Sequence, residues 1–321
     1  MSRGAALAGA LLATLATPAT WPLALAAFLV RGGLLVVVLP IVVLPSPVGL
    51  GNLLAPTLMT VVFRGMSVGV VVIVGLVVLA IVAWIVVGGQ VAAILEAEAA
   101  RIMARDDEGP GAPRRESGPS SAPRARRVAS RILLARVLAH VPTGFALIWG
   151  SARLGAVAYR ELTSPFDVTS PIALRVLGGA PEVIAVIVVV WMLGEILGGI
   201  AARRIAIGGA GVPGALRDAF MTVVRHPLAV FIGFWVPTAA LILVVVPSAL
   251  AATAAWRIVR VAMRPPTDPF WATLAVLLLV ALWIVGLVLI AVTAAWRAAV
   301  WSVGHRELSE RRAGSTERES G

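Results

Sequence analysis

Six long apolar stretches dominate this sequence of 321 residues, and they limit the folds that it can adopt. A helix needs roughly 20 apolar residues to cross the hydrocarbon core of a bilayer. We predict membrane spans near residues 22–44, 67–95, 142–160, 181–202, 227–250 and 270–300. Because every backbone polar group in lipid must be bonded internally, the predicted fold class is all-α: a polytopic integral membrane helical bundle with six spans in three hairpins.

The composition agrees with this fold. Hydrophobic residues make up 60% of the chain and charged residues 13%, with a mean hydropathy of +0.97, whereas soluble domains are about a quarter charged. The sequence has no cysteine and no lysine, which excludes disulfides, thiolate chemistry, P-loops and Schiff bases. The net charge of +11 comes from arginines near the ends of apolar stretches, which favours lipid over nucleic acid as a partner.

The placement of the arginines also predicts the orientation. Most arginines outside the spans lie on segments that share a side with the N-terminus. The positive-inside rule therefore predicts a multi-pass protein of the cell membrane with both termini cytoplasmic. Arg3 and the following "AALAGALLATLA" also resemble a cleavable signal peptide, but its removal would export the arginine-rich segment 101–136. We expect residues 4–16 to form an uncleaved interfacial helix instead.

The chain divides into four parts. Residues 1–105 hold the interfacial helix and the first hairpin, residues 128–304 hold the second and third hairpins, and residues 305–321 form a polar cytoplasmic tail. Residues 106–127, "DDEGPGAPRRESGPSSAPRARR", predict a disordered basic linker. Four arginines at its end are candidates for contact with anionic lipid headgroups: Arg124, Arg126, Arg127 and Arg131. The alternative is a linker that only sets the topology.

Four spans follow a proline, at positions 22, 142, 181 and 227. Proline suits the first turn of a helix because its missing N–H would be unpaired there anyway. Before the fifth span, residues 212–225 predict an amphipathic helix, and "VRHP" places Arg225 and His226 directly before Pro227. We expect these two side chains to anchor at lipid headgroups while the proline starts the span.

The first and last hairpins resemble each other. "WPLALAAFLVRGGLLVVVLP" and "HPLAVFIGFWVPTAALILVVVP" share a proline start, an aromatic-bearing first half and a Leu/Val-rich second half, which is consistent with parallel repeats. With the proline-led spans and the charged tail, the chain resembles the membrane domain of some bacterial glycerophosphodiester phosphodiesterases and stand-alone relatives. That resemblance implies a membrane scaffold or lipid-associated module without the esterase activity, which in that family belongs to a separate soluble barrel.

Three charged residues lie deep inside predicted spans, where each is costly unless paired or hydrated: Arg31, Arg153 and Glu195. Arg297 also lies within a span, but so near its inner end that its side chain can extend to the interface. A joint cluster of the three would be net positive and suited to an anionic headgroup or solute. The alternative is a buried Arg–Glu pair between helices, with the second arginine extending to the interface. Gly194 and Gly198 flank Glu195 with a spacing that lets another helix approach closely.

No motif predicts catalysis, a cofactor or a metal. The three histidines lack ligand spacing, and "GAGVPG" at 209–214 follows a membrane helix rather than a strand, so we interpret it as a turn. We predict a non-enzymatic scaffold or accessory module that associates with lipid or with another membrane protein. The alternative is a transporter of a small solute or lipid, with helix breaks at Gly32–Gly33, Pro40 or Pro237.

Overall fold

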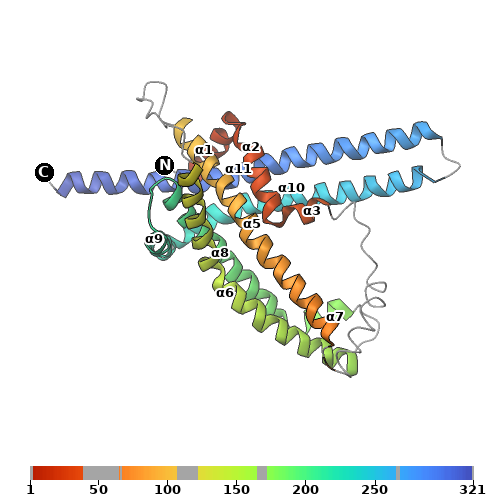
Figure 1. Ribbon diagram of the computed structural model, residues 1–321. Helices are drawn as coiled ribbons and strands as arrows, with labels where there is room; N and C mark the ends of the chain where they lie inside the picture. Colours follow the sequence, from red (N-terminus) through yellow and green to blue (C-terminus); the bar gives the residue numbers. More distant parts are fainter. Residues whose placement is uncertain are drawn as a thin grey trace. The chain divides into compact units, whose positions relative to one another are not determined.

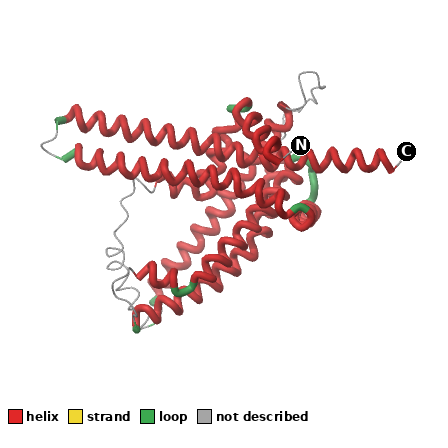
Figure 2. Tube along the Cα trace, turned by 180° about the vertical axis from the view of Figure 1, so that it is seen from behind, coloured by secondary structure: helices red, strands yellow, loops and turns green. Residues whose placement is uncertain are grey.

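The computed structural model describes residues 3–38, 65, 67–106, 122–164, 172–264 and 268–319. Every regular element in these ranges is a helix (Figure 2). In chain order (Figure 1) they are α1 (Arg3–Ala16), α2 (Thr20–Phe28), the π-helical turn η1 (Leu29–Gly33), α3 (Leu34–Val38), α5 (Val68–Asp106), α6 (Ala122–Thr163), α7 (Ile172–Gly178), α8 (Pro181–Ala206), α9 (Val212–Arg225), α10 (Pro227–Ala262) and α11 (Pro269–Glu319). The predicted all-α class is confirmed.

Six helical segments are long and apolar enough to cross a membrane. They are Thr20–Val38, Val68–Met103, Ala125–Glu161, Pro181–Ala206, Pro227–Ala262 and Pro269–Trp301. Each coincides with one predicted span, although residues 39–44 of the first span lie outside the described residues. The chain therefore has the make-up of a multi-pass integral membrane protein, and the grouping into three hairpins stays a prediction.

Several helices extend well beyond the predicted spans. The α6 helix has 42 residues and begins about five and a half turns before the predicted span, at Ala122. Alanine and arginine have high helix propensity, which explains why residues 122–127 are helical and not part of the predicted linker. Residues 107–121 of that linker lie outside the described residues. The predicted tail from residue 305 likewise continues α11 as a helix to Glu319.

The prolines behave in two ways. Pro181 and Pro227 begin α8 and α10 as predicted, and Pro22 lies in the first turn of α2. Pro142 instead lies inside α6, and Pro237 lies inside α10. A proline within a helix removes one backbone hydrogen bond but does not have to end the helix when the packing on both sides continues. Neither residue is therefore a break point.

The first span does break, at Gly32. This glycine has φ 108°, a conformation that interrupts the helix between α2 and α3. Residues with a side chain rarely adopt such a backbone, so glycine is required here. Of the three predicted break points, Gly32–Gly33 is confirmed, whereas Pro40 lies outside the described residues.

The chain forms two compact units. Unit 1 comprises residues 1–113 and 235–300, and unit 2 comprises residues 114–234 and 301–321. The predicted third hairpin thus belongs mainly with the N-terminal helices. In unit 1, Val37 of α3 packs with Leu241 of α10 and Ile290 of α11. The α1 helix is held by two indole N–H groups, since Trp21 donates to Thr14 O at 2.9 Å and Trp296 donates to Leu7 O at 3.2 Å.

In unit 2, α6 and α8 pack along one another (Figure 1). Glycines permit their close approach, as predicted for Gly194: a Cβ there would lie 3.0 Å from the Ala139 carbonyl oxygen. The α9 helix, whose predicted bounds are confirmed, packs against both α6 and α8. Ile196, Val230 and Phe234 form a small core beside it.

Candidate functional site

The helix break in unit 1 lies beside a charge pair. Arg31 directly precedes Gly32, and its guanidinium forms an ion pair with the carboxylate of Glu96 on α5. The Glu96 side chain is 11% exposed and that of Arg31 is 33% exposed. Arg31, predicted as part of a three-residue cluster, therefore has a local partner on the neighbouring helix.

Glu195 has two partners within unit 2, both on α6. His140 Nε2 lies 3.5 Å from Glu195 Oε1, and Arg136 Nη1 lies 3.9 Å from Glu195 Oε2. His140 Nδ1 lies 2.9 Å from the Arg136 carbonyl oxygen, which can only accept, so this nitrogen donates. The neighbouring Gly198 would place a Cβ 3.3 Å from Arg136 Cγ, so its lack of a side chain lets the arginine lie against α8.

Arg153 lies elsewhere in the same unit. Its Nε is 3.5 Å from Glu182 Oε1, in the first turn of α8. By the 1.5 Å rise of a helix, this position is about 20 Å further along α6 than His140. The structure therefore does not bring Arg153 and Glu195 together, and Arg153 belongs to the opposite end of the α6–α8 pair.

That end of unit 2 carries a second ion network. Glu161, at the end of α6, lies 3.5 Å from Arg175 of α7 and 3.9 Å from Arg160. Arg153, Arg160 and Arg175 each lie within 3.9 Å of one of two glutamates, Glu161 and Glu182. Arg153 lies at a partly hydrated surface and has a carboxylate partner, so its charge can be tolerated there without a bound ligand.

The predicted headgroup contacts lie at the other end of unit 2. Arg126, Arg127 and Arg131 are exposed on the first turns of α6, and Arg225 and His226 are exposed where α9 meets α10. The side chain of Arg124 lies outside the described residues. In the same unit, Arg204 of α8 forms an ion pair with Asp218 of α9 at 3.1 Å.

Sequence reasoning missed the partners of the intramembrane charges. Glu96 follows the predicted end of the second span at once, and Glu182 stands in the first helical turn of α8, where the helix dipole favours a carboxylate. Arg136 and His140 are spaced i, i+4, which places them on one helix face. That spacing was the available signal for the contact with Glu195.

Metal-ligating side chains and grooves also bear on what the described residues can bind. Among the residues that the structure describes, no group of three histidine, aspartate or glutamate side chains could hold a metal ion. A groove in unit 1 lies between α3, α10 and α11. It is lined mainly by aliphatic residues around Trp283, and Ser248 contributes a hydroxyl group to the lining. An apolar groove of this kind offers little to a charged solute.

Comparison with protein-family models, with curated proteins and with solved structures yields no match.

Proposed function

We propose that this protein is a non-enzymatic membrane scaffold or accessory module, which associates with lipid or with another membrane protein. The observation that supports it is the local pairing of the charges within the candidate spans. Arg31 faces Glu96 in unit 1, and Glu195 faces His140 and Arg136 in unit 2. A charge that neighbouring helices already neutralise stabilises helix packing and is less suited to binding a passing solute.

We place this module in the cell membrane of a bacterium, with both termini in the cytoplasm. The arginine asymmetry supports this orientation. The role also agrees with the resemblance to the membrane domain of glycerophosphodiester phosphodiesterases, in which hydrolysis belongs to another domain.

A transporter is the second candidate, and one observation favours it. Gly32 interrupts the first span beside the partly exposed Arg31, and broken helices beside intramembrane charge are common at transport sites. The two functions differ in whether water reaches the charges at mid-membrane.

Thiol accessibility distinguishes them, because the chain has no native cysteine. We would introduce Glu195→Cys, with Gly211→Cys and Gly178→Cys as exposed controls that have open space around the added side chain. A membrane-impermeant maleimide is applied from either side. We expect Gly211→Cys to react from the cytoplasmic side, Gly178→Cys from the outside, and Glu195→Cys from neither side. Reaction at position 195 from one side, in a folded protein, would instead establish the transporter.

A further inference from the structure

Helix α9 connects two candidate spans at the same end of unit 2. The α8 helix ends at Ala206 and α10 begins at Pro227, so the connection between them starts and finishes at one membrane surface. The α9 helix has 14 residues and is therefore about 21 Å long. A helix of that length between two such spans lies at the surface.

One side of α9 is fixed against the unit. Val212, Ala215 and Ala219 are buried along it. The ion pair between Asp218 and Arg204 at 3.1 Å ties the same helix to α8. These contacts determine which of the remaining side chains face outward.

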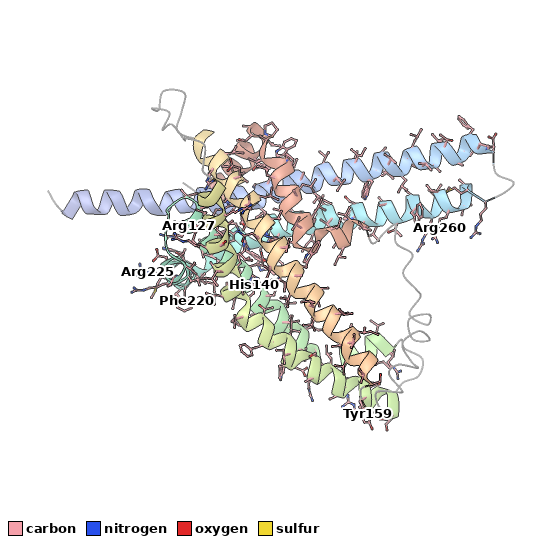
Figure 3. The ribbon with its side chains drawn as sticks, in the orientation of Figure 1. Arg127, His140, Tyr159, Phe220, Arg225 and Arg260 are labelled. Atoms are coloured by element: carbon pink, nitrogen blue, oxygen red, sulfur yellow. The ribbon has the colours of Figure 1, made fainter. Side chains whose placement is uncertain are left out.

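An apolar edge of α9 remains exposed. Phe220 is 56% exposed and Val224 is 57% exposed, and their i, i+4 spacing places them on one face. Phe220 projects from the side of α9 that faces toward the Tyr159 end of α6 (Figure 3). The candidate spans of α6 and α8 extend from α9 in that direction, so this edge faces the bilayer.

Arginines border this apolar edge. Arg217 and Arg225 are exposed on α9, and within the described residues neither forms an ion pair. The carboxylate of Asp218 is already engaged by Arg204. Arg127 and Arg131 are exposed on α6, which packs against α9, and they add positive charge at the same end of the unit.

We propose that α9 is a binding site for anionic phospholipid. Phe220 and Val224 enter the boundary of the acyl chains, while Arg217 and Arg225 hold headgroup phosphates. An amphipathic helix with apolar and arginine-bearing faces lies in the membrane interface in this way, and guanidinium groups bind phosphate with two parallel hydrogen bonds. The proposal deepens the proposed function, on which it rests, by naming the lipid class that the module holds.

The test uses the full chain in detergent with one cysteine, Val224→Cys, that carries an environment-sensitive fluorophore. Titration with a short-chain phosphatidylglycerol is expected to shift the fluorescence toward that of an apolar environment, whereas the corresponding phosphatidylcholine has little effect. A label at Gly214→Cys, an exposed position with open space around it, is the matched control and is expected to stay hydrated.

Arginine variants test whether the response to phosphatidylglycerol depends on Arg217 and Arg225. Arg217→Gln with Arg225→Gln is expected to weaken the phosphatidylglycerol response at position 224 roughly 30-fold, about fivefold for each charge. Replacing both with lysine is expected to recover most of it. The pair Arg257→Gln and Arg260→Gln, exposed on α10, removes the same charge and is expected to leave the affinity unchanged.

Three results would overturn the proposal. They are an equal response to both lipids, unchanged affinity in the Arg217→Gln, Arg225→Gln variant, and an equal loss in the α10 variant. A label at position 224 that stays hydrated with every lipid would point to a protein partner on this edge, and it too would overturn the proposal. The accessibility of position 195 is read separately, so a failed lipid site and a failed scaffold assignment are distinguishable.

Discussion

Substitution of Gly150 by alanine tests the packing on which the α6–α8 pair depends. A Cβ at this position would lie 2.7 Å from Val183 Cγ1 and 3.0 Å from Ile187 Cδ1. Val183 is fully buried, and its β-branched side chain has few alternative rotamers. The valine cannot turn away, so α6 and α8 must separate slightly.

Gly155 on the same helix provides the matched control. It is exposed, and an added Cβ has open space around it. Both substitutions gain the same helix propensity, up to about 1 kcal/mol, so this gain cancels when the two variants are compared. The remaining difference is the cost of overpacking, about 1–3 kcal/mol. We therefore predict that Gly150→Ala has a free energy of unfolding lower than that of Gly155→Ala by this amount.

Equilibrium unfolding in mixed micelles, followed by tryptophan fluorescence, measures both values. Equal free energies of unfolding for the two variants would refute the reasoning, because they would mean that Gly150 does not face Val183. Such a result would also contradict the register of α6 against α8 that places Glu195 beside His140.

Three further substitutions test local features by the same unfolding measurement. Gly32→Ala is expected to lower the free energy of unfolding by about 1–2 kcal/mol because of the positive φ. An unchanged free energy of unfolding would mean that Gly32 does not have this positive φ. Glu96→Gln is expected to lower the free energy of unfolding by about 1–3 kcal/mol, and adding Arg31→Gln is expected to restore part of that loss. If the double variant were no more stable than Glu96→Gln alone, the result would argue against the ion pair. Asp218→Asn is expected to cost less than about 1 kcal/mol, since its pair with Arg204 is partly exposed, and a larger loss would contradict that exposure.

The sequence predicted the helices better than their ends. Length and hydropathy are local properties, so the six spans and the bounds of α9 could be predicted. The continuation of α6 through Pro142 could not, because the favourable packing on both sides of the proline depends on tertiary contacts. The grouping of α10 and α11 with the N-terminal helices depends on distant contacts such as that of Trp283 Nε1 with Val37 O.

The intramembrane charges illustrate the same limit. Their presence at Arg31, Arg153 and Glu195 was evident from the sequence, as was the small-residue spacing at Gly194. Their partners depend on the register between helices, which a single sequence does not specify. A slide of about one turn would have placed Glu195 away from His140 without altering the hydropathy of either helix.

One charge asymmetry within unit 2 connects the predicted orientation with the lipid site. At the end where α6 finishes and α8 begins, Arg153 faces Glu182, and Arg160 and Arg175 face Glu161, so each arginine has a carboxylate partner. At the other end, Arg127 and Arg131 of α6 and Arg217 and Arg225 of α9 are exposed, and the nearby Asp218 is engaged by Arg204. In the orientation that we propose from the positive-inside rule, that end faces the cytoplasm, where the leaflet carries anionic lipid. In that proposed orientation, the arginines that orient the chain during insertion would also be available afterwards to hold lipid phosphates.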